Sequence, residues 1–130
     1  MSNLKECSKC KNLMPHSRDK RNPGGLCNWC KECSRHQKLQ YHFKLSVEDY
    51  NRMLEEQGGR CCICNNPPNS RRLAVDHDHA CCEGRSSCGE CVRGLLCTGC
   101  NNLLYGLEKH SWRIRALAYL DKHKKKVNNE

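Results

Sequence analysis

The stretch LAVDHDHA, residues 73–80, ends an apolar run with side chains that could do chemistry. An imidazole can take up or release a proton near neutral pH, and carboxylates bind hard divalent cations. Asp76, His77 and His79 are therefore candidate catalytic residues, and Asp78 is a candidate turn-former. A lone DHDH string is more often a solvated loop or an incidental metal site, so the surrounding sequence has to decide between these interpretations.

Two cysteine pairs frame this stretch, Cys61-x-x-Cys64 before it and Cys97-x-x-Cys100 after it. Tetrahedral zinc takes four thiolates, and each C-x-x-C turn presents two sulfurs to one ion. The spacing predicts a structural zinc site with no open position for chemistry. Two disulfides are the alternative.

A second group of cysteines lies near the N-terminus, where a C-x-x-C knuckle opens the chain. Its other half is ambiguous, because both Cys27-x-x-Cys30 and Cys30-x-x-Cys33 satisfy the spacing. Cys30 and Cys33 are favoured because they run into a basic, helix-like segment, and His16 is a weaker candidate ligand. The expected second zinc site consists of Cys7, Cys10, Cys30 and Cys33.

A third group of four cysteines lies in the segment ACCEGRSSCGEC, between the DHDH string and the second knuckle. A third zinc ion, free thiols and an opportunistic disulfide are alternatives for this group. Zinc is slightly favoured, although adjacent cysteines chelate one ion awkwardly. The members of this group are Cys81, Cys82, Cys88 and Cys91.

The composition explains why such sites would be needed. Only 37% of the 130 residues are hydrophobic, with a single Phe. The core must therefore be small, and the fold should depend on cross-links such as metal sites or disulfides. The opening residues MSNLKECSKCKN have no apolar signal segment, and no run is long enough to cross a membrane. We therefore expect a cytoplasmic protein, in which zinc thiolates are favoured over disulfides.

The formal net charge is +9, from 23 Lys and Arg against 14 Asp and Glu. A basic balance of this size favours a polyanionic partner, nucleic acid first, although a merely soluble surface is the alternative. Each zinc bound by four thiolates contributes a net charge of about −2, so two such sites would leave about +5. The charge supports DNA or RNA binding without establishing it.

Residues 46–57 are expected to form a helix that is capped by Ser46 and by Asp49 three residues later, and ended by a Gly-Gly pair. Residues 71–75 and 91–96 read as short strands that pair as a hairpin. A helix, a hairpin and a following helix around one pair of knuckles predict a compact α+β unit.

Two helices are expected after the second knuckle. Residues 101–110 continue directly from it, and residues 111–126 form a final helix with a basic tail. One face of this final helix carries Trp112, Ala116, Tyr119 and Leu120. Trp112 is expected to be a core anchor, and the aromatic and leucine side chains of this face could pair two chains into a homodimer.

Asn101 directly follows the last cysteine of the second knuckle, so a zinc ion there would fix both Asn101 and the segment leading to Asp76. Carboxylate and carboxamide oxygens suit a hard cation such as Mg²⁺. In a regular strand Asp76 and His77 would point to opposite faces. For both to act at one site, the strand is expected to bend or end at this point.

The segments CCIC, LAVDHDH and VRGLLCTGCN, with the leading helix SVEDYNRMLEEQGGR, resemble the phage recombination endonuclease VII family of HNH-type (ββα-metal, or His-Me finger) nucleases. The resemblance covers about residues 45–107 and is highly specific, because it combines a helix, two knuckles and the DHDH string. The N-terminal zinc segment is similar to an accessory in many short phage members. The chain departs from the family pattern at residues 80–91, where a cysteine-rich insertion replaces a short turn.

The resemblance implies a role for each matching residue. Asp76 and Asn101 match the ligands of one catalytic divalent cation, Mg²⁺ with Mn²⁺ as an alternative. His77 matches the general base, and His79 matches a second histidine that contacts the scissile phosphate or steadies the transition state. The matching structural zinc ligands are Cys61, Cys64, Cys97 and Cys100.

The expected function is a metal-dependent DNA endonuclease that nicks or cuts duplex or branched DNA, in the host cell cytoplasm if the chain is phage-encoded. The alternatives are a non-catalytic zinc-finger module that binds nucleic acid and a zinc-stabilised protein-interaction domain. The expected fold is a small zinc-stabilised α+β protein with a ββα-metal core. We expect an N-terminal zinc-binding segment over residues 1–44, the nuclease core over 45–107 and a basic C-terminal helix over 108–130.

Overall fold

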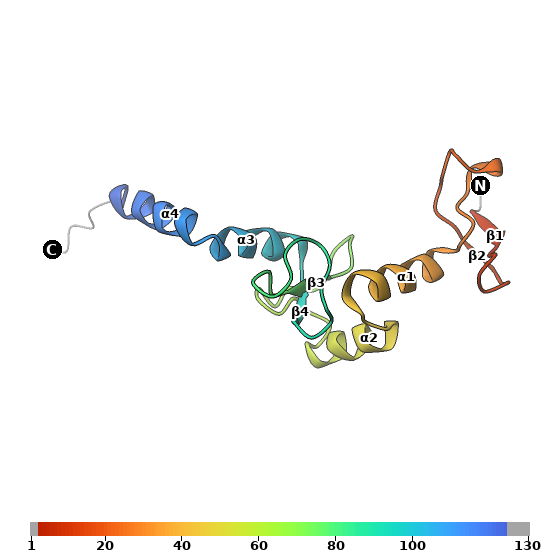
Figure 1. Cartoon of the computed structure of the whole chain (residues 1–130), viewed down its shortest axis with the longest axis horizontal. Coiled ribbons are helices and arrows are strands. Elements are labelled where there is room, and N and C mark those ends of the chain that lie inside the picture. Colours follow the sequence, from red (N-terminus) through yellow and green to blue (C-terminus); the bar gives the residue numbers. More distant parts are fainter. Residues whose placement is uncertain (1–2, 125–130) are drawn as a thin grey trace.

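The computed structural model describes residues 3–124, which form an elongated molecule with an N-terminal hairpin at one end and the last helix at the other (Figure 1). Two small antiparallel sheets pair β1 with β2 and β3 with β4. The small α+β class expected from the sequence is confirmed. In chain order the elements are β1 (Leu4–Glu6), β2 (Leu13–Pro15), η1 (Pro23–Gly25), α1 (Lys31–Phe43), α2 (Val47–Glu56), β3 (Ala74–His77), β4 (Val92–Leu96), α3 (Thr98–Glu108) and α4 (His110–Lys122).

Helix α2 begins as its sequence predicts. The Ser46 side chain accepts from the Asp49 amide at 3.0 Å, and the Asp49 carboxylate accepts from the Ser46 amide at 3.2 Å. This reciprocal capping box satisfies amides that the first turn of a helix would leave unpaired. One turn into the helix, the buried Tyr50 donates its hydroxyl to the carbonyl of Leu73 at 2.6 Å and so joins α2 to the chain entering β3.

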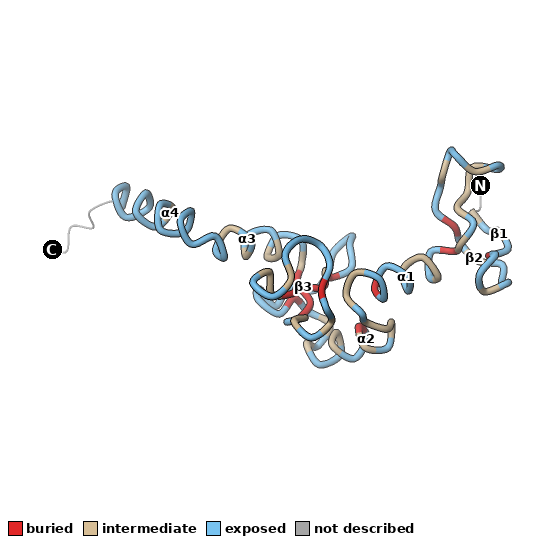
Figure 2. The backbone as a smooth tube through the Cα atoms, viewed as in Figure 1, coloured by how far each residue is buried: buried red, intermediate tan, exposed pale blue. Residues whose placement is uncertain are grey.

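The hairpin of β3 and β4 holds the centre of the core (Figure 2). The predicted pairing is confirmed, although β3 begins at Ala74 rather than Arg71, because the two arginines before it remain exposed. The side-chain amide of Gln57 meets the outer edge of β4, where it accepts from the Leu95 amide and donates to the Leu95 carbonyl, both at 2.9 Å. The buried residues of the core cluster are Leu39, Tyr50, Cys61, Leu73, Val75, Leu95 and Leu96.

The regular pairing of β3 breaks where the sequence predicts a bend. Asp76 lies opposite Gly94 and His77 lies opposite Val92, so the register shifts between the two residues. An extra residue on one strand of a pair rotates the side chains that follow it. Both Asp76 and His77 are consequently buried, at 5% and 4% exposure, instead of alternating between core and solvent.

Helix α4 contacts α3 and leaves most of its surface exposed (Figure 2). Trp112 is 52% exposed, so its predicted role as a core anchor is wrong; its ring packs locally on Gly106 of α3, where an added Cβ would lie 3.2 Å from it. Of the basic tail, Lys125 and Lys126 lie outside the described residues. Within residues 3–124, no helix combines the length and apolar character needed to cross a bilayer.

Replacing Tyr50 by Phe tests the link between α2 and β3. The variant keeps the ring but leaves the Leu73 carbonyl without this donor, which should lower the free energy of unfolding by about 1–2 kcal/mol. Urea unfolding in the presence of zinc measures the change. Tyr41→Phe is the control, because Tyr41 is 69% exposed, and equal stability of the two variants would contradict the assignment.

Candidate active site and cysteine clusters

Four sulfur atoms gather where β4 leads into α3. Those of Cys61, Cys64, Cys97 and Cys100 lie within 4.8 Å of one another, and the sulfurs of Cys64 and Cys97 are 3.9 Å apart. Tetrahedral Zn–S bonds of about 2.3 Å would place the sulfurs about 3.8 Å apart. The group, called here the α3 cluster, could therefore hold a zinc ion.

Backbone geometry explains why the sulfurs of the α3 cluster converge. Cys97 is the N-cap of α3, and its sulfur accepts from the Cys100 amide at 3.4 Å. Burial alone would raise the pKa of Cys61, but three backbone amides, including that of Cys97 at 3.3 Å, outweigh it and lower the pKa to about 6. Hydrogen bonding to the sulfur of Cys97 raises the pKa of Cys100 to about 12. A thiolate at the positive end of a helix is a suitable zinc ligand.

The N-terminal group repeats this arrangement at the start of α1. The four sulfurs that lie within 4.8 Å of one another are those of Cys7, Cys10, Cys30 and Cys33. Cys30 caps α1 as Cys97 caps α3, and Cys7 accepts from the Cys30 amide at 3.2 Å. Of the two sequence alternatives, the structure brings Cys33 rather than Cys27 into the group, here called the α1 cluster.

His16, the weaker candidate ligand, lies outside the α1 cluster. It is fully buried and donates its Nδ1 proton to the carbonyl of Cys27 at 2.6 Å. Among the described residues, its Nε2 is the buried side-chain nitrogen or oxygen that has no partner. His16 therefore stabilises the loop before α1 through its hydrogen bond to Cys27.

A third group, the insertion cluster, lies in the segment between β3 and β4. Its sulfurs also lie within 4.8 Å of one another and belong to Cys81, Cys82, Cys88 and Cys91. It is more exposed than the other two groups. A site with four sulfur donors favours zinc over hard cations, so each of the three clusters could bind a zinc ion.

Asp76, His77, His79 and Asn101 line one groove of about 530 Å³. Asp76 and His77 lie at the end of β3, and His79 lies in the turn that follows it. Asn101 lies in the first turn of α3, and its amide donates to the carbonyl of Cys97 at 2.9 Å. The structure thus brings together the four candidate residues named from the sequence. Phe43, the last residue of α1, also lines the groove.

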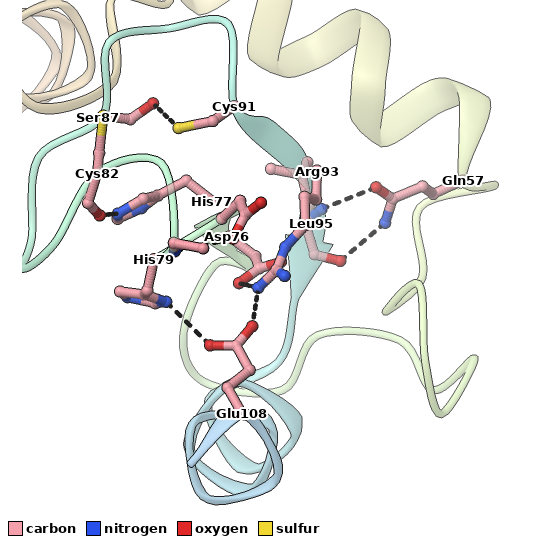
Figure 3. Close-up of polar contacts among 12 residues, drawn as sticks. Gln57, Asp76, His77, His79, Cys82, Ser87, Cys91, Arg93, Leu95 and Glu108 are labelled. Carbon is pink, nitrogen blue, oxygen red and sulfur yellow. Dashed lines mark hydrogen bonds and ion pairs between the residues drawn. The ribbon is translucent and has the colours of Figure 1, made fainter. Parts of the chain in front are cut away.

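Arg93 and Glu108 connect the polar residues of the groove (Figure 3). The guanidinium of Arg93 donates to both carboxylate oxygens of Asp76, at 2.8 and 3.1 Å, and to Glu108 at 2.5 Å. Asp76 first, and Glu108 after it, raise the pKa of Arg93 above its ordinary value. The other oxygen of Glu108 accepts from Nδ1 of His79 at 3.2 Å. One arginine and one glutamate therefore hold Asp76 and His79 in fixed positions.

His77 is oriented by a backbone carbonyl. Its Nε2 lies 2.9 Å from the carbonyl oxygen of Cys82, and since a carbonyl can only accept, Nε2 carries the proton. In the neutral ring Nδ1 then keeps its lone pair. The ring lies 4.5 Å from that of His79 and 6.2 Å from that of Phe43, measured between centroids.

Glu108 was not identified from the sequence. The signal was present, because Glu108 follows Asn101 by seven residues and two helical turns return a side chain to the same face. Arg93, near the start of β4, could on sequence alone be a phosphate contact or equally a surface charge. The pairing of these two residues depends on how α3 crosses the hairpin, which periodicity does not determine.

Comparison with known proteins gives a family match and two similar phage proteins. Residues 34–122 match the family model of recombination endonuclease VII. The chain is 40% identical over 83 residues to the Gene 59 protein of Mycobacterium phage D29, covering 62% of this chain and 46% of that protein. It is 37% identical over 81 residues to the Gene 59 protein of Mycobacterium phage L5, covering 60% of this chain and 44% of that protein. The matched region spans less than half the length of these two relatives.

The chain belongs to the recombination endonuclease VII family, since the family model matches residues 34–122. This range contains α2, the hairpin of β3 and β4, α3 and the α3 cluster. The family expected from the motifs is thereby confirmed.

Removing zinc under reducing conditions should unfold the protein. A structural zinc contributes on the order of 10 kcal/mol, comparable to the whole stability of a small domain, about 5–15 kcal/mol. Because α1 and α3 both begin at cluster cysteines, a zinc-selective chelator should abolish most of the helical circular dichroism, and added Zn²⁺, but not Mg²⁺, should restore it. A spectrum that stays unchanged after chelation would contradict a structural role for zinc.

Proposed function

We propose that this protein is an HNH-type, metal-dependent DNA endonuclease that hydrolyses phosphodiester bonds, with β3, β4 and α3 as its ββα-metal core. The observation that carries the proposal is the convergence of Asp76, His77, His79 and Asn101 on one groove, in a chain of the endonuclease VII family. Hydrolysis of a phosphodiester requires a base for water and relief of the charge that develops on phosphate. The groove offers residues for both tasks.

Asp76 and Asn101 are the residues that would hold a divalent cation, Mg²⁺ or Mn²⁺. Both present oxygen, the donor that hard cations prefer. The carboxylate of Asp76 is already paired with Arg93, but its two oxygens have about four lone-pair sites, so the pair leaves room for a further ligand bond. When bound, such a cation would polarise the phosphate and stabilise the leaving oxygen.

His77 is the proposed general base. Its Nε2 proton is donated to Cys82, so Nδ1 is the nitrogen that can take a proton from an attacking water molecule. The water oxygen forms the new bond to phosphorus, its proton passes to Nδ1, and the bond to the leaving oxygen breaks on the opposite side. His79 has a side chain that is 31% exposed and oriented by Glu108, which suits contact with the scissile phosphate.

Arg93 is proposed to compensate the charge of the buried Asp76. The guanidinium N–H donors that are not bonded to Asp76 or Glu108 are proposed to bind phosphate. The side chain is 38% exposed, whereas Asp76 is 5% exposed. A planar guanidinium can bind a carboxylate and an anion at the same time. The formal net charge of +9 favours DNA as the polyanion. The three cysteine clusters are proposed to carry structural zinc, which requires a reducing compartment such as the host cytoplasm.

Nicking of supercoiled plasmid tests the proposed function. Zinc-loaded protein should nick with Mg²⁺ or Mn²⁺ and not in buffer without them; omitting the cation is preferable to EDTA, which would also remove zinc. His77→Ala should lower the rate by about 10²- to 10⁴-fold, as loss of a general base does. His123→Ala, an exposed histidine at the end of α4, should nick normally.

Retention of DNA without cleavage under any divalent cation would support the non-catalytic zinc-finger alternative. Unchanged nicking by His77→Ala would remove the proposed base while leaving the nuclease. The same assay on a four-way junction and on a linear duplex of matched sequence distinguishes branched from duplex DNA as the substrate.

We further propose that α4 pairs two chains into a homodimer. Large apolar side chains of α4 are more than half exposed, at 52% for Trp112, 65% for Tyr119 and 61% for Leu120. Exposed apolar side chains that share one helix face are typical of interaction sites.

Light scattering of the purified protein should give twice the mass of the 15.0 kDa chain. Leu120→Glu should weaken the dimer at least about 10-fold, since a charge would have to be buried in the interface. Ala118→Glu adds the same charge on the opposite face and should have little effect. A mass of one chain on and off DNA would contradict the dimer.

A further inference from the structure

The insertion between β3 and β4 is organised around the sulfurs of its four cysteines. The sulfur of Cys81 lies 3.9 Å from that of Cys82 and 3.9 Å from that of Cys88. The Cys88 amide points at the Cys82 sulfur from 3.3 Å, as amides point at sulfur in the other two clusters. These separations match the edges of a ZnS₄ tetrahedron, about 3.8 Å, and are far from a disulfide bond of about 2.05 Å.

The insertion cluster is bonded directly to the end of β3. The carbonyl of Cys82, whose sulfur belongs to the cluster, is the acceptor for Nε2 of His77 at 2.9 Å. The amide of Cys82 donates to the carbonyl of Asp78 at 3.0 Å, and the amide of Asp78 donates to the carbonyl of Cys91 at 2.9 Å. The amide of Cys81 also donates to the carbonyl of Asp78, at 3.1 Å, so three of the four cysteines bond through their backbone to the last residue of β3 or to Asp78 directly after it.

The other side of the insertion is docked on α1. The amide of the buried Ser87 donates to the carbonyl of His42 at 2.6 Å, and the Ser87 hydroxyl lies 3.1 Å from the sulfur of Cys91. Gly89 has a φ of +94°, and an added Cβ would lie 2.9 Å from the Lys44 side chain. The insertion is thus packed against a helix, and its sulfurs have little freedom to separate.

We propose that a zinc ion bound by Cys81, Cys82, Cys88 and Cys91 is a positioning device for the general base: it fixes the carbonyl of Cys82, which holds His77 with the proton on Nε2 and the lone pair of Nδ1 toward the groove. This inference rests on the proposed nuclease function. The α3 cluster then positions Asn101 from one side of the groove, and the insertion cluster positions His77 from the other.

The test compares the full-length protein with Cys88→Ser. Elemental analysis of wild type should give three zinc ions per chain, one for each cluster, and the variant should give one fewer. Protein loaded with ¹¹³Cd should show three thiolate-bound resonances, an observation that needs no variant. Cys62→Ser is the matched control, because Cys62 is exposed and belongs to none of the three clusters among the described residues.

Nitrogen-detected correlations of the His77 ring, recorded without DNA, report the position of the ring proton. Wild type and Cys62→Ser should show a single form with the proton on Nε2, and Cys88→Ser should show a mixture of both neutral forms. Nicking by Cys88→Ser should fall by about 10- to 100-fold, as when an outer partner of a site is lost, while retention of DNA stays unchanged.

Two results would overturn the inference. One is wild-type protein with two metal ions per chain and freely reactive thiols in the insertion. The other is a Cys88→Ser variant that loses a zinc ion but keeps the His77 proton on Nε2. Since both readouts are obtained without DNA, a protein that fails to nick contradicts the proposed function and leaves this inference to be judged by metal count and ring proton.

Discussion

The four sulfur atoms at the N-terminal end of α3 are the constraint on which the rest of the structure depends. The hydrophobic core has few members, and one of them is Cys61 itself. Cys97 caps α3 and accepts the hydrogen bond that sets its first turn, so the cluster determines both where the helix begins and where Asn101 lies. Cys61 and Cys64 of the same cluster lie in the segment between α2 and β3 and place it beside α3. With zinc bound to these sulfurs, a chain with 37% hydrophobic residues would gain the order that a larger protein obtains from apolar packing.

The groove is assembled by contacts from several directions. The register shift between Asp76 and His77 turns both side chains inward, where Arg93 holds the first and the carbonyl of Cys82 holds the second. Glu108 joins Arg93 to His79, so the end of α3 is coupled to the end of β3. An active site needs its groups held within a fraction of an ångström, which is easier when each is bonded to a separate rigid element. The exposed α4 lies outside this network and is available for other contacts.

Much of this arrangement could be predicted from the sequence, because it follows from local rules. The capping box at Ser46, the hairpin and the bend after Asp76 depend on neighbouring residues or on period-two alternation. Cys33 is favoured over Cys27 by the helix-like segment it runs into, and the structure places Cys30 at the N-cap of α1 and Cys33 in its first turn. The link from Glu108 to Arg93 depends on the crossing of α3 over the hairpin, and the exposure of Trp112 depends on where α4 leaves the body of the protein. Neither is encoded in a short stretch of chain.

The sulfur clusters are proposed to hold the chain so that Asp76 and Asn101 share one cation. Anomalous diffraction from crystals of the zinc-loaded protein grown with Mn²⁺, measured at the zinc and manganese edges, tests this proposal most directly. We expect zinc at the cysteine clusters and manganese in the groove, bonded to the oxygens of Asp76 and Asn101. Zinc at the clusters with no manganese between those two residues would contradict it.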